Sequence, residues 1–322
     1  MRKIYILSLI LLLWAIPVLG ANTHSTALAS ASKQYWSITK ATQTGLDITG
    51  SMTIEAWVKF TTLPTSVAPV SIASRYQTNS RAFLFYITES GGVYTIALVL
   101  AKAASTNNDG GERSQTITLT TGTWIHLAAV FNATAETIEF FKDGTSLGSG
   151  DSDTDHIYNG SQALEFGANS PHDRFYLNGK LDDIRMWNDV RTQSEIEDNM
   201  SVELVGDEDN LQGYWKFNND AGVDQTSNDN DLTNINSAVF STDIPTWAAA
   251  DTCTCPSGDW YVNSSDNCYL AANCDLDTGG LYLLNTGEGS FNIIDGAELS
   301  VTGLESTSTD INVEAGGKIL FK

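Results

Sequence analysis

Short segments of alternating apolar and polar residues recur along the chain, and they limit the folds that it can adopt. In residues 52–60 the apolar positions share one face of an extended strand, and Thr53, Glu55, Trp57 and Lys59 share the other. Further strands are expected at residues 81–89, 93–101, 115–120, 124–132, 137–142, 163–167, 180–187 and 211–217. One helix is expected at residues 195–200, after a capping box that begins at Thr192. Because helices do not separate the strands, the sequence predicts an all-β sandwich of two antiparallel sheets rather than a parallel α/β fold.

The charge balance is strongly acidic. The chain has 17 Lys and Arg against 39 Asp and Glu, a formal net charge of −22. This balance repels phosphate backbones, and no run of basic residues offsets it, so nucleic acid is not an expected partner. Hydrophobic residues make up 42% of the chain, which is enough for a core and too many for a wholly disordered protein.

The first 20 residues are typical of a signal peptide. A basic start and an apolar run at residues 4–13 precede Val18-Leu19-Gly20, which offers small residues at a cleavage site. A second cleavage site is Ala29-Ser30-Ala31, and an uncleaved N-terminal anchor is the alternative. Later segments are too short to span a bilayer. We therefore expect a mature chain without a membrane span, secreted or attached to the cell surface.

The cysteines divide the chain. All four lie between Cys253 and Cys274, so residues 31–247 are expected to form one large sandwich domain and residues 251–322 a separate module. In an exported protein, disulfides are expected between Cys253, Cys255, Cys268 and Cys274. A 253–255 bridge would close too tight a loop, which leaves 253–268 with 255–274, or 253–274 with 255–268. A zinc site is the alternative, although no Cys-x-x-Cys pair is present.

The segment beyond Cys274 consists of very short strand-like runs punctuated by glycine and acidic residues. This rhythm is typical of the coils of a β-solenoid, in which each coil needs a neighbour to bury its apolar face. We therefore expect a small disulfide-bearing, β-solenoid-like module whose cysteines form an N-terminal cap. A compact disulfide-stapled β domain is the alternative.

Several motifs of the large domain occur in a characteristic order. They are Ser51–Lys59, Gly122–Phe131, Ile138–Gly144, Asn178–Trp187 and Leu211–Phe217. Their order and spacing resemble those of laminin-G-like domains of the concanavalin A-like lectin/glucanase superfamily, over about residues 31–247. The resemblance implies a jelly-roll β-sandwich. It does not specify a ligand, because this superfamily contains lectins, adhesion modules and glycosidases.

Catalytic motifs are not found in the sequence. Glucanases that resemble this domain carry Glu-x-Asp-x-Glu on one strand, which places two carboxylates side by side. No such run is present, and the nearest acidic candidates, Glu195, Glu197 and residues 203–209, fall on the expected helix and the loop after it. The four histidines lack zinc-ligand spacing, and His126 is expected to be a structural strand residue. We predict a protein that is not an enzyme; a polysaccharide hydrolase with a dispersed site is the alternative.

Calcium is the one cofactor that the resemblance suggests, because calcium is frequent in this superfamily and binds to oxygen ligands. The candidate metal ligands are Asp182, Asp173, Asn169 and Asp224. Adjacent strand residues point to opposite faces, so only one of Asp182 and Asp183 is expected to face the core side. The alternative is that Asp182 accepts backbone hydrogen bonds at a turn.

Sugar binding combines an aromatic platform with polar partners. The candidate ligand-binding residues, which fall near expected loops, are Tyr76, Tyr158, His172, Arg174 and Tyr176. Trp57, Trp124, Trp187 and Trp215 lie inside expected strands and are predicted to be core residues. We therefore expect a recognition module that binds a glycan or an extracellular protein, with a structural calcium ion. A surface or adhesion component without a small ligand is the second hypothesis.

Overall fold

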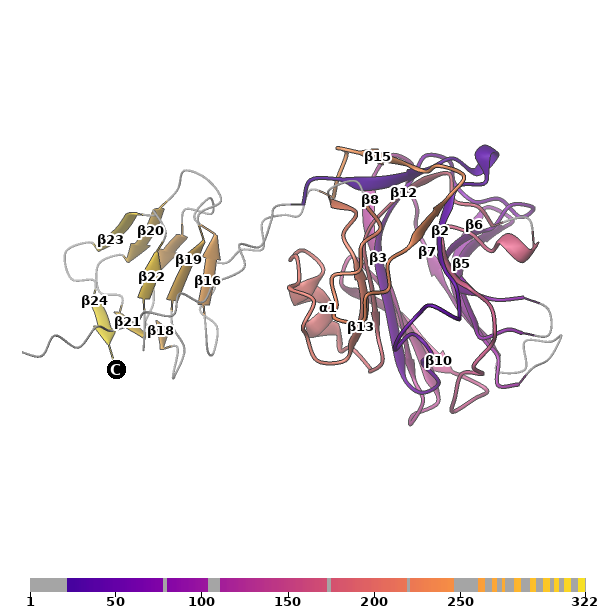
Figure 1. Ribbon diagram of the computed structural model, residues 1–322. Coiled ribbons are helices and arrows are strands. Elements are labelled where there is room, and N and C mark those ends of the chain that lie inside the picture. The colour runs from indigo at the N-terminus through magenta and orange to yellow at the C-terminus, as the bar shows by residue number, and fades with distance from the viewer. Residues whose placement is uncertain are drawn as a thin grey trace, which may run out of the picture.

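The computed structural model describes residues 22–77, 80–103, 111–172, 175–218 and 221–245, together with strands between residues 260 and 321 (Figure 1). The expected signal peptide, Asp173, Arg174, Cys253 and Cys255 lie outside the described residues, and so do the side chains of His172, Cys268 and Cys274. The predictions made for these residues stay predictions.

The first layer of the sandwich is an eight-stranded sheet, here sheet A, in the order β10-β9-β8-β3-β12-β1-β15, with β13 also paired to β12. Its strands pair antiparallel throughout. They are β1 (Ser25–Leu28), β3 (Met52–Phe60), β8 (Trp124–Asn132), β9 (Thr137–Lys142), β10 (Thr145–Asp151), β12 (Gly179–Trp187), β13 (Leu211–Trp215) and β15 (Val239–Ser241).

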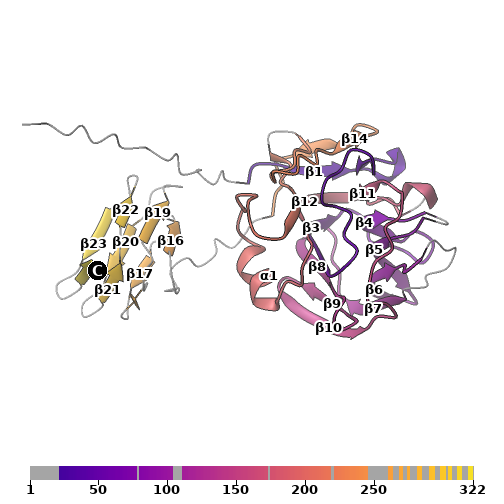
Figure 2. The same ribbon diagram turned by 60° about the horizontal axis from the view of Figure 1, so that its bottom comes forward.

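The second layer is a seven-stranded antiparallel sheet, here sheet B, in the order β14-β2-β11-β4-β5-β6-β7, which faces sheet A (Figure 2). Its strands are β2 (Tyr35–Ile38), β4 (Val70–Arg75), β5 (Phe83–Ser90), β6 (Val93–Leu100), β7 (Glu112–Ile117), β11 (Leu164–Phe166) and β14 (Thr233–Ile235). The short helices are α1 (Gln193–Asn199) and the 3-10 turns η1 (Ser30–Ser32) and η2 (Ser170–His172). Two antiparallel sheets confirm the predicted all-β sandwich.

Strand β1 lies before the expected start of the domain at residue 31. Thr26 pairs in register with Leu181 of β12 on one side and with Phe240 of β15 on the other. Its side chain accepts a 2.8 Å hydrogen bond from Nε1 of the buried Trp36. Residues 25–28 are therefore an integral part of sheet A.

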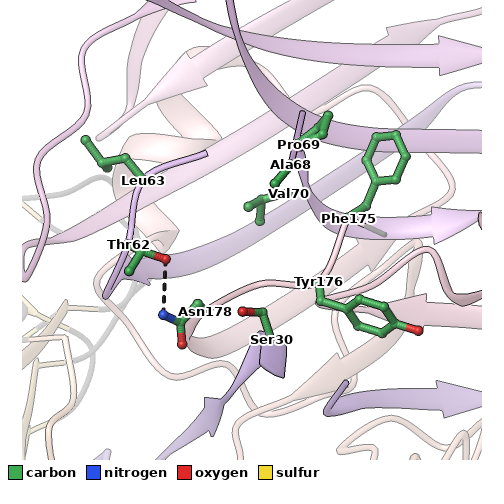
Figure 3. Close-up of a pocket in the computed structure, with 9 residues that line it drawn as sticks. All are labelled: Ser30, Thr62, Leu63, Ala68, Pro69, Val70, Phe175, Tyr176 and Asn178. Atoms are coloured by element: carbon green, nitrogen blue, oxygen red, sulfur yellow. Dashed lines mark hydrogen bonds between the residues drawn. The ribbon is translucent and has the colours of Figure 1, made fainter. Parts of the chain in front are cut away.

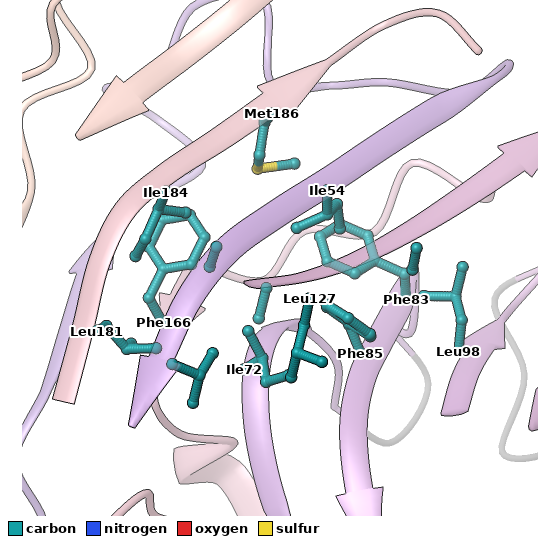
Figure 4. Close-up of a cluster of buried hydrophobic side chains, with 14 of the residues drawn as sticks. Ile54, Ile72, Phe83, Phe85, Leu98, Leu127, Phe166, Leu181, Ile184 and Met186 are labelled. Atoms are coloured by element: carbon teal, nitrogen blue, oxygen red, sulfur yellow. The ribbon is translucent and has the colours of Figure 1, made fainter. Parts of the chain in front are cut away.

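The core fills the space between the two sheets (Figure 4). Sheet A contributes the apolar face of β3, and Ile54 and Val58 are fully buried there. Sheet B contributes Phe85 and Leu98 from paired positions on β5 and β6. The alternation predicted for residues 52–60 therefore assigns the core-facing residues correctly. The opposite face of β3 is buried as well, because α1 and the segment after it cover part of sheet A.

Helix α1 begins where the capping box was predicted. The Thr192 side chain accepts a hydrogen bond from the Glu195 backbone N–H, and the Glu195 carboxylate accepts one from the Thr192 backbone N–H at 2.7 Å. These bonds satisfy two donors that a helix start otherwise leaves unpaired. Ile196 is buried against Val130 and Phe141, which holds α1 on the outer face of sheet A. In the part of the chain that the structure describes, no helix is long and apolar enough to cross a membrane.

The C-terminal strands pair in parallel. Three three-stranded sheets have the orders β16-β19-β22, β17-β20-β23 and β18-β21-β24, so consecutive strands fall in the three sheets in turn. The strands are β16 (Trp260–Asn263), β17 (Cys268–Leu270), β18 (Cys274–Asp275), β19 (Leu281–Leu284), β20 (Ser290–Ile293), β21 (Glu298–Val301), β22 (Leu304–Ser306), β23 (Asp310–Val313) and β24 (Lys318–Phe321). Cys268 is in register with Phe291, and Cys274 with Leu299.

Candidate functional site

The segment that follows β11 is tied to the outer face of sheet B. Glu165 on β11 is 6% exposed, and its carboxylate accepts hydrogen bonds from the Ser170 backbone N–H, at 2.7 Å, and from the Ser170 hydroxyl. Burial raises the pKa of Glu165 above its usual value, although the bonds from Ser170 act in the opposite direction. Further along, the Phe175 carbonyl accepts a 2.9 Å bond from the Ser71 backbone N–H on β4. Both ends of the segment are thus attached to neighbouring strands.

Aromatic side chains gather on this outer face. Phe175 packs with Tyr86 at 5.8 Å between ring centroids, and both contact a small cluster that includes the buried Tyr76. Phe175 has a φ of 70°, a left-handed conformation that is strained for a bulky residue. The next residue, Tyr176, lies 6.2 Å from the ring of Tyr35 on β2. The chain therefore places two consecutive aromatic rings at the surface of sheet B.

A pocket of about 160 Å³ opens beside these rings (Figure 3). It is lined by Ser30, Thr62, Leu63, Ala68, Pro69, Val70, Phe175, Tyr176 and Asn178. Figure 3 shows Thr62 and Asn178 joined by a hydrogen bond, with Ser30 drawn between Asn178 and Tyr176 in this view. The side-chain amide of Asn178 donates to the Thr62 hydroxyl at 3.1 Å, and the backbone carbonyl of Asn178 accepts from the Thr61 backbone N–H at 2.9 Å. The pocket combines aromatic and aliphatic walls with hydroxyl and amide groups, and none of its nine lining residues is charged.

The structure places the predicted ligand-binding tyrosines in different environments. Tyr176 lines the pocket. Tyr76 is only 8% exposed, with its ring among apolar side chains, so it supports the outer face instead of offering a surface. Tyr158 lies elsewhere, where its backbone N–H donates to the Ala101 carbonyl at 2.6 Å. The His172 side chain and all of Arg174 lie outside the described residues.

Sequence reasoning did not identify Thr62, Phe175 and Asn178 as pocket residues. Thr62 and Asn178 are 116 residues apart and meet because β3 and β12 are neighbours in sheet A. Phe175 precedes the predicted Tyr176, and a consecutive aromatic pair in an expected loop was the available signal. Pairing across strands could not be read from the sequence, which explains why the polar side of the pocket was missed.

Three of the four predicted metal ligands lie in described parts of the chain, and their roles differ. The Asp224 carboxylate accepts backbone hydrogen bonds from Tyr214, Thr226 and Asn230, all between 2.9 and 3.0 Å, so it organises a turn. The Asp182 carboxylate accepts hydrogen bonds from the Asn22 amide at 2.8 Å and from the Asp183 backbone N–H at 2.9 Å. The second bond agrees with the alternative given from the sequence, that Asp182 accepts backbone hydrogen bonds at a turn.

Asn169, the third of these residues, is fully buried, and neither of its side-chain polar atoms has a hydrogen-bond partner. A calcium ion needs six to eight oxygen ligands. Among the described residues, no group of three or more His, Cys, Asp or Glu side chains is arranged to hold a metal ion. Calcium binding stays a prediction.

The expected alternation at Asp182 and Asp183 is wrong, because β12 is irregular at this point. Asp183 has a φ of 48°, and the register to β3 shifts between Asp182 and Arg185. Both residues are buried, with exposures of 0% and 3%. Burial, together with the neighbouring Asp183 and Glu203, raises the pKa of Asp182 well above its usual value.

A buried charged network lies under α1 on the outer face of sheet A. The Glu55 carboxylate accepts a 2.8 Å hydrogen bond from the Trp187 indole and contacts His126 Nε2 at 3.3 Å. Arg185 bonds Asp183 at 2.6 Å and donates to the Asn199 carbonyl at 2.7 Å. Burial alone would raise the pKa of Glu55, but the hydrogen bond with His126 and the charge of Arg185 outweigh it and lower this pKa.

This network fastens the end of α1 to the sheet. Glu55, His126 and Arg185 are each 1% exposed, so the group does not open to solvent. His126 is therefore the structural strand residue that the sequence predicted. Two of the acidic candidates for hydrolysis are also engaged: Glu195 caps α1, and the buried Glu203 carboxylate accepts a 2.7 Å bond from the Asn218 amide.

Comparisons with known proteins agree with the sandwich. A family model described as the concanavalin A-like lectin/glucanases superfamily matches residues 30–197, which is more than half of the chain. No curated protein matches the chain.

Solved structures are similar at low sequence identity. The structure of a "putative carbohydrate binding protein" from Bacteroides ovatus has a TM-score of 0.54 and 17% identity, over 69% of this chain and 61% of that one. This chain therefore spans less than two thirds of that protein. A pentraxin from Limulus polyphemus has a TM-score of 0.48 and 14% identity, over 68% and 95% of the two chains. The CBM40 domain of a Ruminococcus gnavus sialidase, bound to α2,3-sialyllactose, has a TM-score of 0.41 and 14% identity, over 55% and 98%. At 17% identity the likeness to the Bacteroides ovatus structure shows the fold alone.

Proposed function

This chain belongs to the concanavalin A-like lectin/glucanase superfamily, and we propose that its sandwich is a carbohydrate-binding module that binds a neutral sugar in the pocket beside Tyr176. The pocket itself carries the proposal. Sugars present apolar C–H faces and hydroxyl groups, and the pocket is lined by the aromatic residues Tyr176 and Phe175 together with the polar residues Thr62 and Asn178. Because none of the lining residues is charged, a neutral sugar fits better than an acidic one.

The size of the pocket limits what it holds. At about 160 Å³ it is smaller than the sites of drug-sized ligands, which occupy roughly 300–1,000 Å³. One terminal or branching monosaccharide unit is the appropriate size, with the remainder of the glycan outside. The module would then recognise the end of a glycan rather than a long stretch of it.

The test is a glycan-array screen of the mature chain, made with calcium and again with a chelator. We expect binding to neutral glycans. We expect Tyr176→Ala to raise the dissociation constant about tenfold or more, because the contact with the tyrosine ring is lost. Tyr158→Ala is the matched control, because it removes a tyrosine that does not line the pocket. If Tyr158→Ala abolishes binding and Tyr176→Ala does not, the pocket is the wrong site. Loss of binding on chelation would support a calcium ion in the module.

We propose a non-catalytic role. The buried Glu55 network and the capping function of Glu195 both support this reading, because these carboxylates are already committed to structural bonds. Release of reducing sugar from any array-positive polysaccharide would contradict it. If no glycan binds in either condition, the surface or adhesion role without a small ligand becomes the better explanation.

We also propose export, with cleavage near Gly20 rather than after Ala31. Cleavage after Ala31 would remove β1, which pairs with both β12 and β15, and would remove Ser30 from the pocket. N-terminal sequencing of the protein recovered from the medium or the cell surface checks this. A mature chain that begins at residue 32 would contradict the proposal.

For the C-terminal strands we propose one parallel solenoid with three strands per coil, acting as a spacer. This proposal is supported by the strand order, because every third strand along the chain pairs in the same parallel sheet. Cys268 and Cys274 occupy register positions next to Phe291 and Leu299, so we place a disulfide frame at the first coil. Peptide mapping under non-reducing conditions distinguishes the two predicted pairings. Free thiols in the exported protein would exclude the frame.

A further inference from the structure

Two lysines and one tryptophan lie side by side on the outer face of sheet A. Lys59 of β3 is in register with Lys180 of β12 on one side and with Trp124 of β8 on the other. Each lysine side chain is 20% exposed. Like charges that lie directly opposite each other on paired strands repel, so this arrangement is unfavourable unless an anion lies between them.

A carboxylate of the same chain meets this need. One oxygen of Asp243 accepts from Lys59 Nζ at 2.9 Å and from the Trp124 indole at 3.1 Å. The other oxygen accepts from Lys59 Nζ at 2.8 Å and from Lys180 Nζ at 2.5 Å. Burial would raise the pKa of Asp243, but the bonds from the two lysines and from Trp124 lower it to about 2. Both oxygens are thus bound by donors from three adjacent strands.

Asp243 lies where its side chain could leave the two lysines and Trp124 without disturbing the central strands. It follows the edge strand β15 in an irregular segment, and its side chain is 39% exposed. The lysines and Trp124, in contrast, are fixed by the register of central strands of sheet A. If Asp243 were withdrawn, the three residues would remain adjacent in the sheet, with two positive charges and no counter-ion.

We propose that Lys59, Lys180 and Trp124 form a carboxylate-binding site whose resident ligand is Asp243, and that this site binds the carboxylate of an external organic acid when Asp243 is absent. The site is separate from the uncharged pocket and does not depend on its ligand. The two-oxygen geometry favours a planar carboxylate over a spherical anion such as chloride. In the intact chain the tethered carboxylate competes at a high effective concentration, so free acids bind weakly.

The experiment compares the intact mature chain with Asp243→Ala. Sodium acetate or sodium glucuronate is added against sodium chloride at equal ionic strength, because screening alone changes surface charge effects. We expect the midpoint of thermal unfolding of Asp243→Ala to rise by about 4 °C when the acid reaches ten times its dissociation constant. The intact chain should not respond at the same concentration. A stronger response to glucuronate than to acetate would show that the sugar ring also contacts the site, and equal responses would show recognition of the carboxylate alone.

Three controls make the result decisive. Lys180→Met combined with Asp243→Ala should abolish the response, because one donor to the second oxygen is lost. Asp153→Ala removes an exposed aspartate that pairs with Arg113 elsewhere, and it should create no response. If Asp243→Ala does not fold, Asp243→Asn removes the charge at similar volume and carries the same test. A response that survives Lys180→Met, or that chloride produces equally, would overturn the proposal.

Discussion

The carboxylate of Asp224 is the centre of a turn whose stability can be calculated roughly. The side chain is 5% exposed and accepts four hydrogen bonds. One oxygen accepts from the backbone N–H groups of Tyr214 and Thr226, and the other from the Thr226 hydroxyl and the Asn230 backbone N–H. An Asp224→Asn substitution keeps the size of the side chain and replaces one of these acceptors with a donor.

The new side-chain amide will adopt the orientation that loses the fewest hydrogen bonds. With its NH₂ group in place of the second oxygen, the Thr226 hydroxyl can rotate to accept, but the Asn230 N–H faces another donor. A buried donor without a partner costs about 1–3 kcal/mol, and the remaining bonds lose the assistance of the charge. We expect Asp224→Asn to lower the free energy of unfolding by about 3 kcal/mol. Asp224→Ala, which removes all four bonds, should lower it by about 5 kcal/mol.

Urea unfolding followed by tryptophan fluorescence measures both changes, and a thermal midpoint lower by about 10 °C is the corresponding shift for Asp224→Asn. Asp229→Asn is the matched control, because it makes the same chemical change at an exposed position in the same segment. The control should change the stability by less than about 0.5 kcal/mol. An Asp224→Asn variant as stable as the control would refute the reasoning. A loss that occurs only in the presence of calcium would show that Asp224 is a metal ligand after all.

Three further substitutions have defined outcomes. Glu55→Gln should lower the free energy of unfolding by about 2–3 kcal/mol at pH 7. The difference should shrink as the pH falls below about 4, because a carboxylate with a lowered pKa stabilises the fold only while it is ionised. Urea titrations at several pH values measure this difference. Gly179→Ala should prevent normal pairing of β12, since a Cβ there would lie 2.1 Å from the Lys59 carbonyl, and a circular dichroism melt near that of the unchanged chain would contradict this. Thr192→Ala should lower the stability by about 1 kcal/mol through loss of the cap of α1, and Thr192→Ser should restore most of it in the same melt.

Much of the sandwich could be predicted because strand signals are local. The alternation in residues 52–60 assigned the core-facing side of β3, and the Thr192 capping box located the start of α1. What failed depended on neighbours in space. Alternation could not show that the polar face of β3 is covered by α1, nor that β12 is irregular at Asp183.

The candidate site was less predictable for the same reason. Tyr176 was identified as a loop aromatic, but the polar residues that line the pocket with it lie just after the end of β3 and just before the start of β12. Trp124 was predicted to be a core residue, and it lies instead on the outer face of sheet A with its indole bonded to Asp243. Trp215, which received the same prediction, is fully buried in the main core. A tryptophan in a strand can face either side, and only the register decides which.

The pairing of β1 with β15 has a mechanical consequence. Ser25 at the start of β1 is in register with Ser241 at the end of β15, so the chain enters and leaves the sandwich at one place. Tension applied through the segment after β15 would peel β15 from β1 and open their hydrogen bonds one after another, rather than loading them together in shear. The Ser25 hydroxyl, which donates to the Asp243 carbonyl at 2.8 Å, and the lysine contacts of Asp243 lie at the point where the force is first applied. A pull on the chain would therefore withdraw Asp243 from Lys59 and Lys180 before the rest of the sandwich is disturbed.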